Sequence, residues 1–384
     1  MDFEEFSSQE WQLLSQVSRP SRYAGSEWRP YHKADWESSK LRICLAFPDV
    51  YEIGMSYYGF QIIEAFINAM NRKYLADRVY CVWPDMERLM RSHNALLYSV
   101  EQKKPVKDFD ILAFTLPHEA SYTNILTILS LSGLPLKSSD RDNASPIVIA
   151  GGYGAYVPEV MSEFVDVFCV GEAEALLPSL LPVLEGTKGM SRAERLKECA
   201  EVKGCYVPLC YDGRTVERQI TSELFTLDSM IVPSVNIVHD RAAIELFRGC
   251  SRGCRFCQAG MVNRPVRERP VEEAASSIMN ILSSTGWEEV GLLSLASCDY
   301  SGITELIDAI SPELHAKLSL PSLRMDGFSV GLAERLEGLR SRHGSITFAP
   351  EAGTQRLRDV INKGINDDMI TSCLKEIFSR GWER

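Results

Sequence analysis

Residues 245–260, ELFRGCSRGCRFCQAG, decide the interpretation of the chain. An apolar run leads into a loop that carries Cys250, Cys254 and Cys257 at the spacing C-x3-C-x2-C. Three thiolates are one ligand short of the four that close an iron–sulfur cube, so one iron is left open. A small molecule with an amine and a carboxylate can chelate that iron, and cofactors of this kind supply chemistry that side chains lack. Zinc is the alternative, but a zinc site needs four ligands at paired spacing, and no fourth Cys or His lies nearby.

The same loop resembles the signature of the radical S-adenosylmethionine superfamily, C-x3-C-x-aromatic-C, with Phe256 at the aromatic position. The resemblance implies that the three cysteines bind a four-iron four-sulfur (4Fe-4S) cluster and that Phe256 packs near the adenine of S-adenosylmethionine. It also implies that the cluster, once reduced by a reductase, ferredoxin or flavodoxin, splits this molecule to give a 5'-deoxyadenosyl radical.

Residues 345–364, SITFAPEAGTQRLRDVINKG, resemble a segment of the same superfamily, E-x-G-[ST] followed by N-[KR]-G, on the fourth strand of the barrel. Polar groups at the carboxyl ends of barrel strands face the active site, so Glu351 and Thr354 are expected to contact the nucleoside or the methionine. Asn362, Lys363 and Gly364 are expected to end a helix and form a turn.

The segment LLSLASCDYSG, residues 292–302, gives a weaker indication. It lacks the Gly-Gly-Glu sequence that many members of the superfamily use for the methionine amino group. Ser294 is therefore only a weak candidate for that contact.

Between Leu41 and Glu185, short apolar runs alternate with amphipathic stretches, which predicts a doubly wound parallel sheet. The segment after the first run, FPDVYEIGMSYYG, resembles the D-x-H-x-x-G loop of cobalamin-binding domains: Asp49 and Gly54 match, and Tyr51 stands in place of the histidine. Gly151 and Gly152 follow PIVIA, where glycines permit a nucleotide tail to approach closely.

This resemblance leaves two alternatives open for the N-terminal domain. It binds cobalamin without a histidine ligand, or it has kept the fold and lost the cofactor. The glycines fit both alternatives, since they also serve a tight turn.

The expected fold class is α/β throughout, with a Rossmann-like, cobalamin-binding-like domain followed by a partial (β/α) radical S-adenosylmethionine barrel of about four strand-helix units. The expected organisation is an N-terminal arm at 1–40, the doubly wound domain at 41–185, a connector with a hairpin at Asp212-Gly213 at 186–238, and the barrel at 239–384. Such a barrel usually has six units, so we expect it to be C-terminally incomplete or completed by a partner domain or chain.

The composition narrows the classes of function. The chain of 384 residues is 45% hydrophobic and carries a net charge of −11, which argues against a broadly basic nucleic-acid surface and leaves RNA open as a substrate. No secretory signal and no apolar stretch of ~20 residues is present, so a cytoplasmic protein without membrane association is expected. The eleven cysteines then indicate reduced thiols and metal ligands rather than disulfides.

The leading hypothesis is an enzyme that generates the radical to modify an unidentified substrate, by methyl transfer if cobalamin is present. One alternative is a methylthiotransferase acting on RNA or protein, whose second cluster would need Cys44, Cys81 and Cys169. Another is a non-catalytic iron–sulfur protein that transfers electrons. His93 and His118 are expected at surface or helix-end positions rather than as ligands.

Overall fold

The computed structural model describes residues 8–31, 33–311, 316–320, 323–325, 332, 335 and 347–380. The chain divides into two compact units, Met1–Thr221 with Ile231–Asp240 and Ser222–Met230 with Arg241–Arg384. It therefore leaves the first unit and returns to it before residue 241. The predicted connector at 186–238 is shared between the two units instead of standing apart.

The first unit is built on a six-stranded sheet in the order β2-β1-β3-β4-β5-β6. The strands are β1 (Leu41–Phe47), β2 (Tyr74–Tyr80), β3 (Ile111–Thr115), β4 (Ile147–Gly151), β5 (Val167–Cys169) and β6 (Cys205–Tyr206). The first five are parallel, and β6 pairs antiparallel with β5. This order is that of a flavodoxin-like doubly wound sheet, which confirms the predicted fold class.

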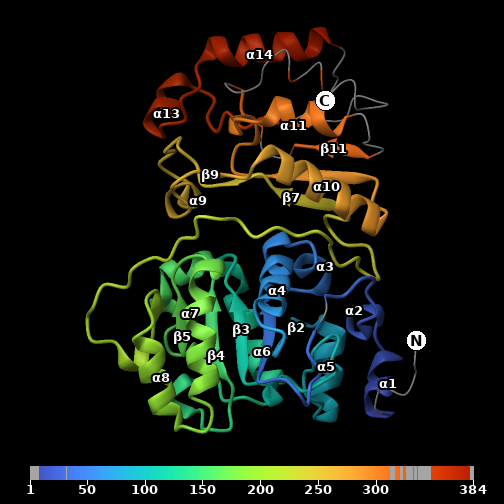
Figure 1. Ribbon diagram of the computed structural model, residues 1–384, viewed down its shortest axis with the longest axis vertical. Coiled ribbons are helices and arrows are strands. Elements are labelled where there is room, and N and C mark those ends of the chain that lie inside the picture. The colour runs from blue at the N-terminus through green and yellow to red at the C-terminus, as the bar shows by residue number, and fades with distance from the viewer. Residues whose placement is uncertain are drawn as a thin grey trace. The chain divides into compact units, whose positions relative to one another are not determined.

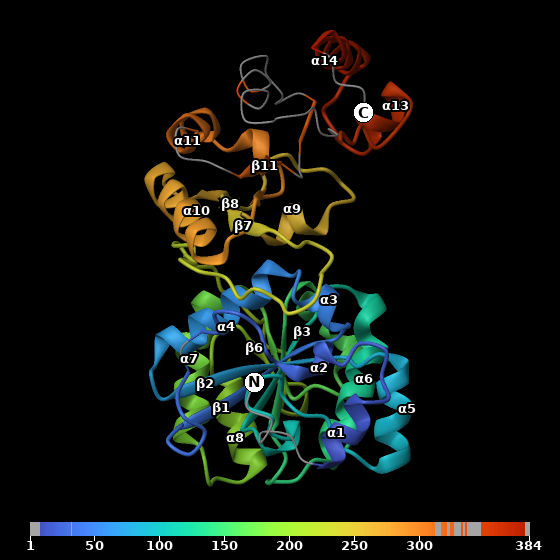
Figure 2. The same cartoon turned by 90° about the vertical axis from the view of Figure 1, so that its right-hand side faces the viewer.

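Helices cover both faces of this sheet, as Figure 2 shows, with α4, α7 and α8 on one side and α1, α5 and α6 on the other. Successive residues of β1 point to opposite faces: Ile43 and Leu45 join one apolar core, and Cys44 and Ala46 join the other. Burial on both faces explains why most residues of these strands are apolar, with the paired charges of β2 as an exception. The helices are α1 (Ser8–Leu14), α2 (Ser21–Ala24), α3 (Tyr51–Gly54), α4 (Tyr58–Met70), α5 (Pro84–His93), α6 (Tyr122–Leu131), α7 (Ala173–Gly186) and α8 (Arg192–Ala200).

Short 3-10 turns complete the first unit: η2 (Val106–Asp108), η3 (Glu119–Ser121), η4 (Ser138–Asp140), η5 (Tyr153–Tyr156), η6 (Pro158–Met161) and η7 (Pro208–Cys210).

The segment predicted as an N-terminal arm is fastened to the first unit by buried charges. Lys33 lies 2.6 Å from Glu64 of α4 and 2.9 Å from Glu101. Arg78 of β2 is fully buried and pairs with Glu64 at 2.8 Å and with Glu101. Buried charges are tolerated only when they are paired, so removing one partner of this network should be costly.

The second unit contains a three-stranded parallel sheet in the order β11-β10-β7 and a small antiparallel pair, β8-β9. Helices α10 and α11 lie side by side against this sheet (Figures 1 and 2). Its elements are β7 (Ala242–Glu245), β8 (Phe247–Arg248), α9 (Gln258–Val262), β9 (Arg267–Glu268), α10 (Val271–Thr285), β10 (Glu289–Leu293), η8 (Ser297–Asp299), α11 (Ile303–Ile310), β11 (Lys317–Ser319), α13 (Gln355–Val360) and α14 (Asp367–Ser379). Three parallel strands with intervening helices agree with the expected partial barrel.

The fourth expected strand is described only in part. Phe348 forms a parallel bridge with Leu323, whereas residues 336–346, which include the start of the segment SITFAPEAG, lie outside the described residues.

The hairpin predicted at Asp212-Gly213 is wrong. Pro208 has no amide hydrogen and begins the 3-10 turn η7, so the run before Asp212 does not extend as a strand. The carboxylate of Asp212 accepts a hydrogen bond from the amide of Arg214 at 3.1 Å and closes a turn without paired strands.

Within the part of the chain that the structure describes, no helix combines the length and the apolar character needed to cross a bilayer.

Candidate functional site

The cysteine loop begins where β8 ends, and glycine is required at its start. Gly249 has a φ of 101°, and a side chain there would place its Cβ 2.4 Å from the carbonyl oxygen of Pro265. Only glycine accepts both the left-handed backbone and this approach. Gly253, with a φ of 75°, makes the second sharp turn between Cys250 and Cys254.

Two of the three cysteine side chains approach Gly260. The position that a Cβ of Gly260 would take lies 3.4 Å from the Sγ of Cys257 and 3.9 Å from the Cβ of Cys250. Cys254 is buried, and its carbonyl oxygen accepts a hydrogen bond from the amide of Cys257 at 3.1 Å. None of the three is in a disulfide.

The donor set of this loop fits a 4Fe-4S cluster. Three thiols on one loop, with space that glycine leaves between two of them, are the ligands that a cluster with one open iron needs. Among the described residues, no group of three or more His, Cys, Asp or Glu side chains is already arranged as a metal site. The fit is therefore one of ligand type and loop shape.

Two other elements hold the main chain of the cysteine loop. The side-chain amide of Asn362 donates to the carbonyl oxygen of Gly253 at 2.9 Å, and the amide of Arg255 donates to the carbonyl oxygen of Ile361 at 2.9 Å. From η8, Asp299 pairs with the guanidinium of Arg252 at 2.5 Å. None of these contacts is predicted by the sequence. The N-[KR]-G pattern is the one local signal at Asn362, and by itself it predicts only a helix end.

Glu351 and Phe256 lie beside the same loop and are linked through Lys363. The ammonium group of Lys363 is 3.0 Å from a carboxylate oxygen of Glu351 and 5.9 Å from the centre of the Phe256 ring. Phe256 is 55% exposed, which leaves ring surface for a ligand. Glu351 has a φ of 69°. This backbone conformation is energetically unfavourable for residues other than glycine, and such residues are concentrated at functional sites.

Thr354 and Ser294 occupy the ends of neighbouring elements. Thr354 is the N-cap of α13, and its hydroxyl accepts a hydrogen bond from the amide of Leu357 at 3.4 Å. Ser294 follows β10, and its hydroxyl lies 2.9 Å from that of Ser297. In this unit Phe256 thus lies on the cysteine loop, whereas Thr354 and Ser294 lie at a helix start and after a strand end.

In the first unit, the loop after β1 directs its side chains into the protein. Tyr51 is 1% exposed, and its hydroxyl donates to a carboxylate oxygen of Glu27 at 3.1 Å. Burial, followed by the nearby charge of Glu27, raises the pKa of Tyr51. A Cβ at Gly54 would lie 2.4 Å from the ring of Tyr80. Asp49 is half-buried and accepts a hydrogen bond from the amide of Val50 at 2.7 Å.

Gly151 and Gly152 lie at the carboxyl end of β4. Gly151 is paired with Thr115 of β3 in the sheet register. Gly152 has a φ of 100°, and its Cβ would lie 2.9 Å from the carbonyl oxygen of Leu116. The close packing of the turn therefore explains the glycine at position 152.

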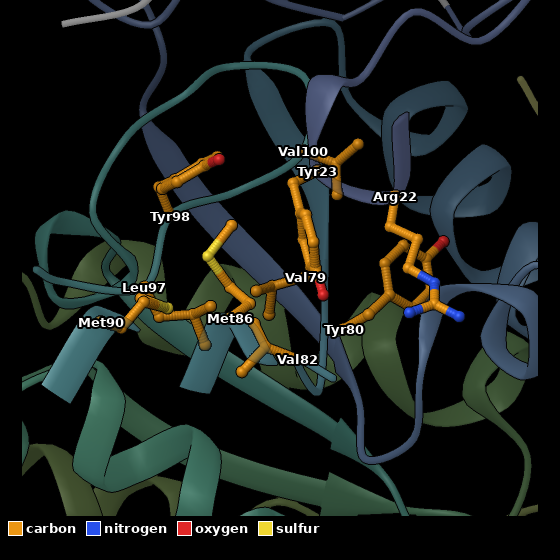
Figure 3. A pocket seen from close by; sticks show the side chains of 10 residues that line it. All are labelled: Arg22, Tyr23, Val79, Tyr80, Val82, Met86, Met90, Leu97, Tyr98 and Val100. Carbon is orange, nitrogen blue, oxygen red and sulfur yellow. The ribbon is translucent and has the colours of Figure 1, made fainter. Parts of the chain in front are cut away.

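Two cavities in the first unit contain none of the predicted site residues. One, lined by Tyr23, Met86 and Tyr98 among others, is shown in Figure 3 and has a volume of about 20 Å³, room for about one water molecule. The other, about 180 Å³, is lined by residues from Ala200 to Glu217.

The cysteines proposed for a second cluster do not come together. Cys44 and Cys81 belong to the core on one face of the sheet, and Cys169 packs against the core on the other face. Burial raises the pKa of Cys44, and it raises that of Cys81 to about 12, so both remain thiols near neutral pH. This arrangement gives no support to the methylthiotransferase alternative.

The two histidines considered as possible ligands, His93 and His118, occupy the positions expected of them. His93 is the last residue of α5, and His118 is exposed at the start of η3.

Two family models match the chain: "Radical SAM proteins, N-terminal" over residues 59–208 and "Radical SAM superfamily" over residues 244–384. An uncharacterized protein of Methanocaldococcus jannaschii is 28% identical over 296 residues, which is 74% of this chain and 59% of that protein. The chain thus spans about three fifths of the length of this curated relative.

Two solved structures share the fold, both of the radical S-adenosylmethionine methyltransferase TsrM from Kitasatospora setae. One holds tryptophan and a S-adenosylmethionine analogue, and the other holds cobalamin and a [4Fe-4S] cluster. Each has a TM-score of 0.61 and 12% identity, and they cover 88% and 89% of this chain and 66% and 68% of their own chains. The matching models account for both units, and the cysteine loop lies within the second of them. The chain therefore belongs to the radical S-adenosylmethionine superfamily.

Proposed function

We propose that this protein binds a 4Fe-4S cluster through Cys250, Cys254 and Cys257 and cleaves S-adenosylmethionine reductively to modify a substrate that is still unidentified. The observation that carries the proposal is the loop that holds three free thiols. The backbone of this loop requires glycine at position 249. When bound and reduced, the cluster supplies the electron that splits S-adenosylmethionine.

The side chains around the loop provide for the adenosine and methionine parts of this ligand. The exposed ring of Phe256 offers an apolar surface to the adenine, with Lys363 beside it. Glu351 is partly exposed although it is paired with Lys363, so its carboxylate retains capacity to accept a hydrogen bond from an amine or a ribose hydroxyl.

Two hydroxyls add polar contacts. The helix cap uses an acceptor site of the Thr354 hydroxyl, and its hydrogen can still be donated to a ligand oxygen. Ser294, at the end of β10, is the weaker candidate for the methionine amino group because it already contacts Ser297.

This chemistry requires a one-electron donor, and we propose a reductase, a ferredoxin or a flavodoxin in the cytoplasm. The absence of disulfides among the eleven cysteines fits a reducing compartment.

The test is anaerobic reconstitution of the protein with iron and sulfide, reduction with dithionite in the presence of S-adenosylmethionine, and chromatography for 5'-deoxyadenosine. We expect 5'-deoxyadenosine and methionine to form in equal amounts. A protein that carries the cluster and accepts electrons but leaves S-adenosylmethionine intact would instead be the electron carrier.

A second proposed function is corrinoid binding at the carboxyl edge of the first sheet. It is supported by the β2-β1-β3-β4-β5 order, whose ligands lie at the carboxyl ends of the strands, and by the fold shared with TsrM, one structure of which holds cobalamin. The residue at the histidine position does not fit a cobalt ligand, because the Tyr51 hydroxyl is buried against Glu27. Methyl transfer by this protein depends on this binding.

Absorption spectroscopy tests the corrinoid proposal. Titration of the protein with several cobalamin forms should give a bound spectrum without histidine coordination. If none of these forms binds at high micromolar concentration, the domain has kept the fold and lost the cofactor.

A further inference from the structure

The cysteine loop is held mainly through its main chain, and most of these contacts come from one short segment. Asn362 donates to the carbonyl oxygens of Gly253 at 2.9 Å and Arg252 at 3.5 Å. Arg255 donates through its amide to Ile361 at 2.9 Å and through its guanidinium to the carbonyl oxygen of Val360. The segment Val360–Asn362 is the end of α13 and the turn that follows it.

The other end of α13 carries the residues expected to contact S-adenosylmethionine. Thr354 caps the helix, and Glu351 reaches past it to pair with Lys363 at 3.0 Å. With six residues, α13 spans about 9 Å, so its two ends are close.

Arg358 makes this segment rigid. Its side chain is buried, and its guanidinium donates to the carbonyl oxygens of Ala352 at 2.9 Å and Ile365 at 3.0 Å, which lie on either side of the helix. Asp367 at the start of α14 pairs with the same group. These contacts join the residues before α13 to those after it.

We propose that α13 with its following turn is a strut that sets the conformation of the cysteine loop, and that Asn362 is the positioning residue at its contact with that loop. The strut joins the Glu351–Thr354 contact region to the carbonyl groups that precede Cys254. Ligand binding at one end and the orientation of Cys254 and Phe256 at the other are thus coupled. This inference rests on the proposed function, since it assigns the strut to the same site.

The backbone at Asn362 permits a clean test. Its φ is 57°, a conformation that asparagine, aspartate and glycine adopt more readily than other residues. Asn362→Gly removes the side chain without strain, and Asn362→Asp keeps its shape but replaces the amide donor with a carboxylate. Asn366→Ala is the matched control, because the side chain of Asn366 caps α14 by accepting a hydrogen bond from the amide of Met369 at 2.8 Å, and among the described residues no hydrogen bond joins this side chain to the cysteine loop.

Three measurements separate positioning from general stability. The first is hydrogen exchange of residues 253–257 in the protein without cluster. The second is the iron content after anaerobic reconstitution, with the electron paramagnetic resonance spectrum of the reduced cluster before and after S-adenosylmethionine is added. The third is the dissociation constant of S-adenosylmethionine by equilibrium dialysis.

For both Asn362 variants we expect exchange of residues 253–257 to rise about tenfold, and affinity for S-adenosylmethionine to fall about tenfold, while iron is retained. The spectral change on adding S-adenosylmethionine should become smaller. Asn366→Ala should lower the unfolding midpoint and leave exchange in the loop, iron and affinity at wild-type values.

If both Asn362 variants show the hydrogen-exchange rates of residues 253–257 and the S-adenosylmethionine affinity of the wild type, the proposed role of α13 as a strut is wrong. Equal effects in Asn366→Ala would overturn it too, because general destabilisation would then be the cause. Failure of the wild-type protein to form 5'-deoxyadenosine would refute the proposed function instead, since exchange in the cluster-free protein does not depend on cleavage.

Discussion

The loop after β1 and the loop after β8 differ in how they hold the side chains that the two resemblances single out. In the first, Tyr51 donates to Glu27, and Glu52 pairs with Arg22 at 2.8 Å. In the loop after β8, Asn362 and Ile361 form hydrogen bonds with main-chain groups of the loop. These hydrogen bonds do not involve the side chains of Cys254 and Phe256. A loop whose side chains bond to its own domain contributes to the fold, whereas a loop held by its backbone can present its side chains to a ligand.

The difference explains why two resemblances of similar appearance carry unequal weight. The C-x3-C-x2-C pattern names the chemical groups proposed to bind the cluster, and the structure has these groups on a loop that requires glycine at position 249. The D-x-Y-x-x-G pattern names a loop shape, and the domain accounts for both Tyr51 and Gly54 by its own packing.

The largest effect should follow from removing a cluster ligand. Cys254→Ala leaves two thiols on the loop, which do not hold a 4Fe-4S cube, so iron after anaerobic reconstitution should fall from about four per chain to nearly none. Cys44→Ala is the control, because Cys44 is buried in the core of the first unit, and it should keep the full iron content. Full iron in Cys254→Ala would place the cluster elsewhere and remove the contrast between the loops.

The second prediction concerns the charges behind the loop after β1. Arg78→Met leaves Lys33 as the remaining buried cation beside Glu64 and Glu101, and removing one partner of such a buried network should lower the free energy of unfolding by about 3–5 kcal/mol. Urea denaturation measures this loss. The exposed pair of Arg91 with Glu87 is the comparison, for which Arg91→Ala should cost less than about 1 kcal/mol. Equal small losses would show that the buried network contributes little.

The sequence predicted the elements that local pattern determines. Apolar runs located the strands of the doubly wound sheet because both faces of that sheet are buried. The spacing of the cysteines predicted a cluster loop because three ligands on one loop follow one another closely in the sequence, and this stays a prediction. The hairpin at Asp212-Gly213 was wrong because the run before it contains Pro208, which begins a 3-10 turn.

Contacts between distant residues could not be predicted in this way. The hydroxyl of Tyr51 donates a hydrogen bond to Glu27, which lies 24 positions earlier in the sequence. The side-chain amide of Asn362 donates to the carbonyl oxygen of Gly253, which lies 109 positions earlier. Neither pair has a periodic or local signature. The same limit applies to the antiparallel strand β6, which has only two residues.

The third prediction tests whether Tyr51 serves the fold alone. Tyr51→Phe removes the buried hydrogen bond to Glu27 and should lower the free energy of unfolding by about 1 kcal/mol. Any corrinoid affinity of the wild-type protein should be unchanged, because the phenol faces the interior. Urea denaturation and spectroscopic titration of the same preparation measure both quantities. A large loss of corrinoid affinity would give this loop a ligand-binding role like that of the cysteine loop.

The smallest effect should be the acid dependence of Glu52, the other inward side chain of the loop after β1. Its burial alone would raise the pKa, but hydrogen bonds from Arg22 and Arg19 outweigh that effect and hold the pKa of Glu52 below its usual range. A carboxyl whose pKa is lower in the folded state stabilises the protein above its unfolded pKa, and this stabilisation is lost as the pH falls through the folded value.

Glu52→Gln should therefore be less stable than the wild type near pH 7. The difference should be at most about 1 kcal/mol, because Arg19 is largely exposed and the pair is partly screened. The difference should shrink below about pH 4 as Glu52 becomes protonated. Urea denaturation of both proteins at several pH values measures it, and a difference that stays constant down to pH 3 would show that the carboxylate of Glu52 does not fasten this loop to the N-terminal segment.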